Sequence, residues 1–447
     1  MTTPTALDTL HDALEKGSTM ELNEIVEELH PSEIADVLES LPPKQRSQLW
    51  EQESLEQGEI LPYVGETVRV ELMQSMPTTE VATAAAKMDP DDAVDILQDL
   101  PDEVVEEVLQ AMDVQHRRRL TQVLFYPENS AGGLMNIDVL TVRTGMTLKM
   151  VLRYLRRLSQ LPEKTDILMV VDAHNHYRGV LWLTDLLINA PHLTVEQVMS
   201  TNIEAIQAHL SAHEVARLFE QRDLVSVPVV DEDGVLVGRI TIDDAVDVIR
   251  AEADHHLMSR AGLDEDDDMF APVLKTTRDR ALWLGINLAT AFLAAWVIGL
   301  FEATLEKIVA LAVLMPVVAS MGGIAGSQTL TVVIRGMALN QVTNTNTPWL
   351  LRKELAVGFL NGLMWAVVVT LIAILWFSSL RLGLIIGTAV IINLFCAALS
   401  GVLIPLLLRR LSIDPALAGG VILTTVTDVV GFSAFLGLAT IFLLKVV

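Results

Sequence analysis

Five long apolar segments in the C-terminal part of the chain constrain its fold more than any other feature. Each contains about 20 residues or more, the length that a helix needs to cross the hydrocarbon layer of a bilayer. They cover approximately residues 281–301, 308–333, 355–380, 382–408 and 416–444. Five such segments are difficult to reconcile with the buried helices of a soluble enzyme. We therefore predict a five-helix transmembrane domain over residues 271–447.

The basic residues at the ends of these segments predict how they cross the membrane, because cytoplasmic loops carry an excess of Lys and Arg. Eight basic residues fall on one side, Lys275, Arg278, Arg280, Arg335, Arg352, Lys353, Arg409 and Arg410. Three fall on the other side, Lys307, Arg381 and Lys445. The first ten residues also lack the basic and apolar regions of a cleaved signal peptide. We expect a multi-pass protein of the cell (inner) membrane with a cytosolic N-terminus and an external C-terminus.

One ionisable residue, Asp428, lies alone inside the fifth segment. A carboxylate at membrane depth costs at least a few kcal/mol, so such a residue usually faces a polar pathway or a partner. Gly420, Thr424 and Gly431 recur near it at helical spacings and present small or hydroxyl groups beside the acid. This pattern favours an ion pathway. The alternative is a carboxylate that pairs with Arg335 or forms a hydrogen bond to another helix.

The second segment contains Pro316 and, a few residues later, three glycines within Met321–Gln328. Glycines in a membrane helix permit close contacts with neighbouring helices. They also permit a local break that exposes backbone carbonyls to an ion. The sequence leaves both interpretations open.

The soluble half is strongly acidic. Residues 1–270 carry 20 Lys and Arg against 51 Asp and Glu, a balance of −31, whereas residues 271–447 carry 11 against 6, a balance of +5, so that the formal net charge is −26. Such a surface repels nucleic acid and attracts multivalent cations. Cys396 is the only cysteine, which excludes a disulfide framework within one chain. No phosphate-binding glycine loop with lysine and no HExxH motif occurs, so we do not expect an enzyme.

Residues 1–128 are predicted to form an acidic, all-α superhelical domain. The segment Pro31–Pro42 is similar to the segment Pro90–Pro101. Each copy begins with a proline, which the first helical turn tolerates, and places apolar residues on one helix face before a second proline ends it. Repeated units of this kind are typical of a helical solenoid.

A second repeat occupies residues 129–250. An aspartate, a glycine and an aspartate recur with the same spacing 59 residues apart, namely Asp172, Gly179 and Asp185, then Asp231, Gly238 and Asp244. Each copy predicts a helix followed by strand, turn, strand and helix. This unit resembles the CBS domain, here as an α/β tandem pair. The resemblance implies binding of adenine nucleotides or ions, with Asp185, Pro228 and Asp244 as the nucleotide candidates, and a scaffold without ligand is the alternative.

Carboxylates crowd two predicted helices of the soluble half. One helix contains Asp89, Asp91, Asp92, Asp95 and Asp99, and the other contains Asp243, Asp244, Asp247 and Glu252. Mg²⁺ prefers oxygen ligands and keeps several waters, so loosely spaced carboxylates suit it. For any single residue, a solvated face or a favourable interaction with the helix dipole explains the charge equally well. The whole pattern favours cation binding.

The order of these parts resembles the MgtE family of magnesium channels over nearly the whole chain. The most specific matches are Ala131–Met135, Pro316–Arg335, Asp414–Leu417 and Thr427-Asp428. The chain departs from the family pattern at Ile324, Ser327 and Gly420, where asparagines are common, and at His255 and His256, where carboxylates are common.

The resemblance implies a homodimer in which Asp428 of both protomers lines a pore for hydrated Mg²⁺. It also implies cytosolic Mg²⁺-sensing ligands at Asp91, Asp95, Asp223, Asp244, Asp247 and Glu252, and a connecting plug helix within residues 243–270. Divalent cations and membrane lipid are the expected partners, with ATP as a further regulator. Two alternatives remain: a transporter of the same fold for Co²⁺, Mn²⁺ or Ni²⁺, and a membrane-anchored CBS sensor of metal or nucleotide.

Overall fold

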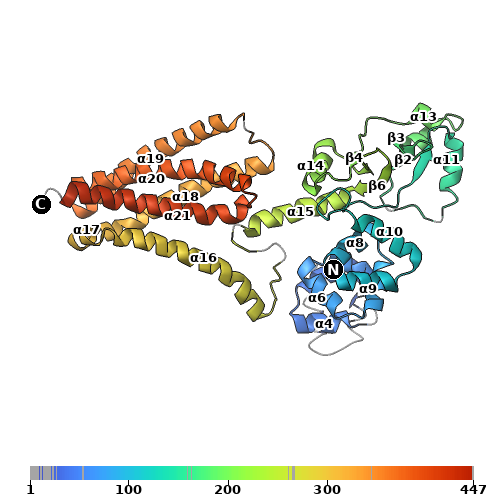
Figure 1. The fold of residues 1–447 in the computed structure, drawn as a ribbon, viewed down its shortest axis with the longest axis horizontal. Helices are drawn as coiled ribbons and strands as arrows, with labels where there is room; N and C mark the ends of the chain where they lie inside the picture. Colours follow the sequence, from blue (N-terminus) through green and yellow to red (C-terminus); the bar gives the residue numbers. More distant parts are fainter. Residues whose placement is uncertain are drawn as a thin grey trace. The chain divides into compact units, whose positions relative to one another are not determined.

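The computed structural model describes residues 28–444 except 53, 54, 159, 163, 260, 264–266 and 344, and before residue 28 it describes residues 10, 13, 22, 25 and 26. The chain forms two compact units (Figure 1). The first comprises residues 1–254 and 266–272, and the second comprises residues 255–265 and 273–447.

Short helices form the N-terminal part of the first unit. They are α3 (Pro31–Glu39), α4 (Pro43–Trp50), α5 (Gln57–Ile60), η1 (Leu61–Tyr63), α6 (Glu66–Gln74), α7 (Thr78–Ala85), α8 (Pro90–Gln98), α9 (Asp102–Ala111) and α10 (Val114–Leu124). Proline occupies the first position of α3, α4 and α8, where its missing N–H has no intrahelical partner to lose. Apolar residues on one face of these helices are buried in a common core. The predicted all-α domain is confirmed.

Two small sheets follow, each with a parallel pair of strands and an antiparallel hairpin. The first contains β1 (Thr141–Arg143), β2 (Ile167–Val171) and β3 (Tyr177–Trp182), and the second contains β4 (Ile206–Gln207), β5 (Ser226–Val230) and β6 (Leu236–Thr241). The accompanying helices are α11 (Leu148–Leu155), α12 (Leu183–Ile188), α13 (Val195–Val198) and α14 (Ala212–Arg222). This architecture confirms the predicted α/β tandem pair.

The repeated aspartates have a structural role in the two hairpins. Oδ1 of Asp172 accepts hydrogen bonds from the backbone N–H groups of His174 and His176. Oδ1 of Asp231 accepts the equivalent bonds from Asp233 and Val235. The first aspartate of each copy therefore stabilises the turn between the two strands of its hairpin.

The segment Ala131–Met135 joins the helical part to the second sheet. The backbone N–H groups of Ala131 and Gly132 donate to the carbonyls of Leu210 and Ala208, at 2.7 and 2.8 Å. A Cβ on Gly133 would lie 2.4 Å from the carbonyl oxygen of Glu128. The helices and the second sheet share one hydrophobic core around this junction.

We therefore expect Gly133→Ala to destabilise the first unit by about 1–3 kcal/mol, because a side chain there forces the backbone apart. Thermal unfolding of the full-length protein, followed by tryptophan fluorescence, measures the effect. Gly145→Ala is the matched control, since nothing lies within 4 Å of the Cβ that it adds. Equal melting temperatures for the two variants would contradict the proposed close packing.

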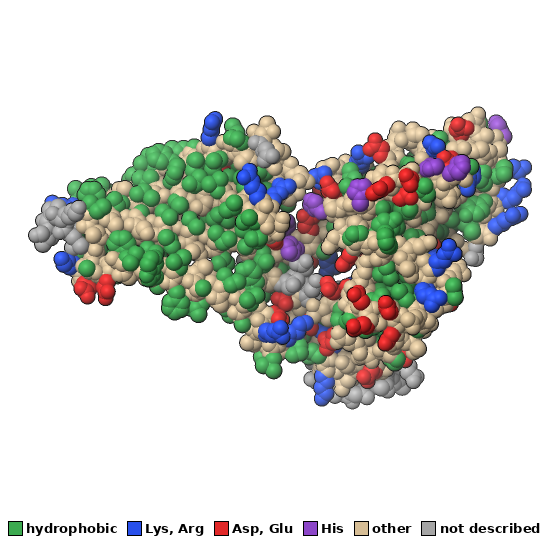
Figure 2. All heavy atoms as spheres, viewed as in Figure 1, with side chains coloured by type: hydrophobic (Ala, Val, Ile, Leu, Met, Phe, Trp, Pro, Cys, Tyr) green, Lys and Arg blue, Asp and Glu red, His purple; other side chains and the backbone are tan. Residues whose placement is uncertain are grey.

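Helix α15 (Ile242–Ser259) follows β6 directly, and the second unit then contains the long helices. These are α16 (Val273–Gly299), α18 (Ala310–Ala338), α19 (Thr347–Phe377), α20 (Leu380–Arg410) and α21 (Pro415–Ala439), with the short helix α17 (Glu302–Lys307) and the π-turn η2 (Thr440–Leu444). Among the described residues, five helices are long and apolar enough to cross a membrane. Figure 2 shows hydrophobic side chains over most of the visible face of these helices. The predicted five-helix membrane domain is confirmed, and the chain is a multi-pass membrane protein.

Helix α20 is the centre of the second unit, since it packs against α18, α19 and α21, while α16 packs mainly against α21 (Figure 1). Glycines permit these contacts. A Cβ on Gly322 would lie 2.2 Å from Nδ2 of Asn393, and one on Gly326 would lie 2.9 Å from a methyl group of Leu423. Helix α18 is continuous through this region. The glycines of α18 therefore serve close helix packing, and the predicted alternative of a local break is not present in α18.

The domain limits that we predicted at residues 128, 250 and 270 stay predictions. Helix α15 continues across the second of these limits, from Ile242 to Ser259.

Candidate metal sites and ion pathway

Two helix starts in the first unit bring carboxylates together. Asp91 and Asp92 lie in the first turn of α8, and Asp243 and Asp244 lie in the first turn of α15. Asp91 interacts electrostatically with Asp243 and Asp244, so the two helix starts are neighbours. We call the seven acids in and next to these turns the carboxylate cluster: Asp89, Asp91, Asp92, Asp95, Asp243, Asp244 and Asp247. Acids are favourable at a helix N-terminus, which explains their position in each helix but not their mutual proximity.

Burial and mutual repulsion make four of the seven acids unusually weak. The pKa is raised to about 8 for Asp92 and Asp244, to about 7 for Asp95 and to about 6 for Asp91. Burial is the largest cause in all four, and repulsion by a neighbouring carboxylate is the second. At neutral pH several acids of the cluster therefore hold protons, and a cation that prefers oxygen ligands can displace these protons.

The cluster has few compensating donors among the described residues. Nδ2 of Asn136 donates to Oδ1 of Asp91 at 3.1 Å, and the backbone N–H of Thr241 donates to Oδ2 of Asp244 at 2.8 Å. Burial raises the pKa of Asp243, but the ion pair with Lys164 and the hydrogen bond from the Thr241 hydroxyl together outweigh burial, so the pKa is lowered. Acidic groups thus outnumber their basic partners where α8 meets α15.

Two predicted sensing residues have other surroundings. Oε2 of Glu252 lies 2.7 Å from Nδ1 of His213, so α15 is tied to α14 at this point. Asp223 ends α14 in the left-handed conformation, with φ of 50°. It lines a cavity of about 240 Å³ in the tandem pair, with Trp182 and Arg222 among the other lining residues.

The three residues predicted for a nucleotide do not line this cavity. Asp185 lies in the first turn of α12, and its backbone carbonyl accepts from Nδ2 of Asn189. Pro228 lies within β5, paired in register with Arg239 of β6. Asp244 belongs to the carboxylate cluster. The residues of the sequence that do mark this cavity are Trp182, Asp223 and Leu224, since all three line it.

In the second unit, Asp428 is half-buried on α21. Among the residues that the structure describes, its carboxylate forms no hydrogen bond or ion pair, and no pair with Arg335 is present. The hydroxyl of Thr427, its neighbour, donates to backbone carbonyls of the same helix. Within the described part of the chain, Asp428 is thus a carboxylate in a membrane helix without a hydrogen-bond or ion-pair partner.

Two adjoining grooves lie beside α18 and α21, with volumes of about 540 and 530 Å³, and the second is also lined by α16 and by residues 261–263. Ser327 and Thr424 line both. Thr424 precedes Asp428 by one helical turn, and Gly420, one turn earlier, has nothing within 4 Å of its Cβ position. The small and hydroxyl residues predicted near the acid therefore border open space.

Three features escaped prediction. Asn393 is fully buried on α20, donates from Nδ2 to the carbonyl of Val318 at 2.8 Å, and leaves Oδ1 without a partner. The second is His255, where the family pattern has a carboxylate: its Nε2 lies 3.0 Å from Oδ2 of Asp414, the N-cap of α21. The third is Asp92, which is not among the predicted ligands, although its pKa is among the most strongly raised.

Comparison with known proteins identifies the family. The family model described as divalent cation transporter matches residues 315–438, the MgtE intracellular N domain matches residues 29–129, and the CBS domain matches residues 195–251. The cytosolic domain of a Mg²⁺ channel, MgtE, solved in complex with ATP, is 31% identical with a TM-score of 0.50, and the match covers 54% of this chain and 99% of that one.

Full-length relatives extend the match to the whole chain. The magnesium transporter MgtE of Bacillus subtilis is 29% identical over 433 residues, 96% of each chain. The magnesium transporter MgtE of Thermus thermophilus is 31% identical over 440 residues, 97% of this chain and 98% of the relative. The soluble helical and tandem units, the five membrane helices and these matches together show that the chain belongs to the MgtE family of divalent cation transporters.

Proposed function

We propose that this protein is a Mg²⁺ channel or transporter, and not an enzyme, in which Mg²⁺ moves down its gradient past Asp428. The observation that carries the proposal is the carboxylate of Asp428, which has no partner in the described chain and lies one turn from two open grooves. An unpaired carboxylate in a membrane helix costs several kcal/mol, and water and a cation in an ion pathway reduce this cost because they solvate the charge. The relatives support Mg²⁺ as the ion, because their names describe magnesium transporters.

The pathway is best explained by a homodimer. The grooves along α18 and α21 are open, and a second copy of the same face would enclose them and bring two Asp428 carboxylates to one axis. Two carboxylates attract a divalent ion through its water shell more strongly than a monovalent one. The proposed orientation places the N-terminus in the cytosol and the C-terminus outside, as the basic residues predict.

Cytosolic Mg²⁺ gates this pathway in our proposal. When Mg²⁺ is scarce, the acids of α8 and α15 can ionise only against mutual repulsion, and this repulsion favours separation of the two helix starts. When Mg²⁺ is abundant, it bridges Asp91 and Asp95 with Asp244 and Asp247, and α15 acts as the plug. Asp223 and Glu252 remain proposed ligands, which a neighbouring protomer or a rearranged state would complete. ATP remains a proposed regulator, because the similar cytosolic domain was solved with ATP.

A flux assay with the purified full-length protein in liposomes tests the proposal. We expect Mg²⁺ influx that requires only a Mg²⁺ gradient and that falls when Mg²⁺ is present on the side of the soluble unit. A transporter chiefly for Co²⁺, Mn²⁺ or Ni²⁺ would instead show influx of those ions that excess Mg²⁺ does not compete away. A membrane-anchored sensor would show no flux above empty liposomes.

A further inference from the structure

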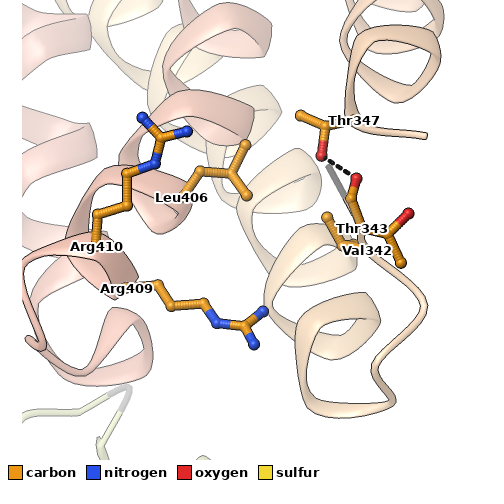
Figure 3. A pocket seen from close by; sticks show the side chains of 6 residues that line it. All are labelled: Val342, Thr343, Thr347, Leu406, Arg409 and Arg410. Atoms are coloured by element: carbon orange, nitrogen blue, oxygen red, sulfur yellow. Dashed lines mark hydrogen bonds between the residues drawn. The ribbon is translucent and has the colours of Figure 1, made fainter. Parts of the chain in front are cut away.

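A second polar cavity lies in the membrane unit, away from the grooves beside Asp428. Its volume is about 600 Å³, and it lies between the segment that enters α19 and the end of α20 (Figure 3). Six residues line it: Val342, Thr343, Thr347, Leu406, Arg409 and Arg410. Figure 3 shows the two arginines and Leu406 on α20, across the cavity from the two threonines.

The charge in this cavity is positive and uncompensated. Among the described residues, neither guanidinium has a hydrogen bond or ion pair, and no carboxylate lines the cavity. Basic residues are favourable in the last turn of a helix, which explains why Arg409 and Arg410 end α20. This interaction with the helix end does not provide a hydrogen-bond partner for the N–H groups of the two guanidinium groups. The site is therefore prepared for an anion.

The threonines add a polar wall. The hydroxyl of Thr347 donates to the backbone carbonyl of Thr343 at 2.7 Å, and the hydroxyl oxygen of Thr343 accepts from the backbone N–H of Asn346 at 3.4 Å. The Thr343 hydroxyl proton is then available to a further acceptor.

Apolar surface adjoins the cavity on α20. Leu406 lines the cavity itself, while Leu403 and Leu407 on the same helix are 45% and 58% exposed. Trp349, two residues after Thr347, is 68% exposed, and tryptophan is enriched where a membrane helix meets the headgroups. The cavity and its surroundings therefore suit a molecule with a polar group that contacts the arginines and an apolar group that packs along α20.

We propose that this cavity binds the phosphate of an anionic phospholipid headgroup. The planar guanidinium matches a phosphate with two parallel hydrogen bonds, and basic pockets between membrane helices suit anionic lipids. The adjoining apolar surface favours a lipid over a free phosphate. The proposal rests on the membrane unit alone and does not depend on ion transport.

Native mass spectrometry of the purified full-length protein tests the proposal, with phosphatidylglycerol or phosphatidylcholine added to the detergent. We expect phosphatidylglycerol to stay bound and phosphatidylcholine to be lost. One arginine near an anionic lipid contributes about fivefold to affinity. In Arg409→Gln/Arg410→Gln, which removes two, affinity for phosphatidylglycerol should therefore fall about 25-fold. Arg381→Gln, at the opposite end of α20, is the matched control and should bind as the wild type does.

Three outcomes would overturn the proposal. One is equal retention of phosphatidylglycerol by the double variant and the wild type, provided that both elute as one species on size exclusion. Another is equal loss in Arg381→Gln, which indicates unspecific attraction. The third is displacement of the lipid by millimolar inorganic phosphate, which identifies a free anion as the ligand. None of these outcomes bears on Mg²⁺ flux, so failure here is distinguishable from failure of the proposed channel.

Discussion

Replacement of Asp428 by alanine is expected to reduce Mg²⁺ flux at least about 100-fold while the protein still folds and inserts. The carboxylate offsets part of the cost of bringing a divalent ion to membrane depth, and the loss of a few kcal/mol of this attraction corresponds to two or more powers of ten in rate. Folding should not suffer, because Asp428 makes no hydrogen bond or ion pair among the described residues. Removal of an unpaired buried charge is neutral or stabilising.

The measurement is Mg²⁺ influx into liposomes that contain equal amounts of wild type or variant. Asp428→Glu keeps the charge and should retain part of the flux, whereas Asp428→Asn keeps the size and should lose it. Glu302→Gln, an exposed acid of α17, is the control for the loss of one negative charge from the membrane unit. Flux within threefold of wild type for Asp428→Ala would contradict a pathway along this face of α21.

The five membrane helices could be predicted because length and hydropathy alone determine them. Their limits could not. Helix α16 begins at Val273, whereas the apolar segment suggested Ala281, because the intervening turns contain Lys275 and Arg278 and a helix continues through polar residues once it has formed. Hydropathy locates the part within the lipid and not the whole helix.

The sequence also predicts the acids of the carboxylate cluster, but it does not predict that they lie close together in space. Each acid lies at a helix start for local reasons, and only the packing of α8 near α15 makes Asp91 and Asp244 neighbours. The same limit explains Asn393, because an isolated asparagine in an apolar segment does not reveal which carbonyl it contacts. Tertiary contacts between distant segments leave no periodic trace in a single sequence.

A second large effect is expected from pH and Mg²⁺ acting on the carboxylate cluster. An acid whose pKa is raised by folding binds protons more tightly in the folded state. The stability that it contributes is therefore lost as pH rises from 3.8, the pKa of the acid in the unfolded chain, through its pKa in the folded protein. For Asp92 and Asp244 that value is about 8, so without Mg²⁺ the melting temperature of the first unit should fall between pH 5 and pH 9.

Mg²⁺ should reverse this loss, because it replaces the displaced protons. At 100 times its dissociation constant, one ion that binds only the folded state stabilises by about 3 kcal/mol. The stabilisation should be small at pH 5, where the cluster is protonated, and large at pH 8. Calorimetric scans of the full-length protein with Mg²⁺ or EDTA across this range measure the effect. A Mg²⁺ shift that does not change with pH would contradict cation binding by the cluster.

The double variant Asp92→Asn/Asp244→Asn separates this explanation from a general effect of charge. Without Mg²⁺ its melting temperature should fall less between pH 7 and pH 9 than that of the wild type, because its two weakest acids are gone and only Asp95, with a pKa of about 7, and Asp91, with a pKa of about 6, still lose protons near this range. The amide oxygen at position 244 can still accept from the N–H of Thr241. The double variant should also lose most of the stabilisation by Mg²⁺ and keep conducting when Mg²⁺ is high on the side of the soluble unit. Asp102→Asn, an exposed acid in the first turn of α9, changes the net charge without touching the cluster and should behave as wild type. If the double variant instead closes at the same Mg²⁺ concentration as the wild type, the carboxylates between α8 and α15 do not sense the ion, whatever their effect on stability.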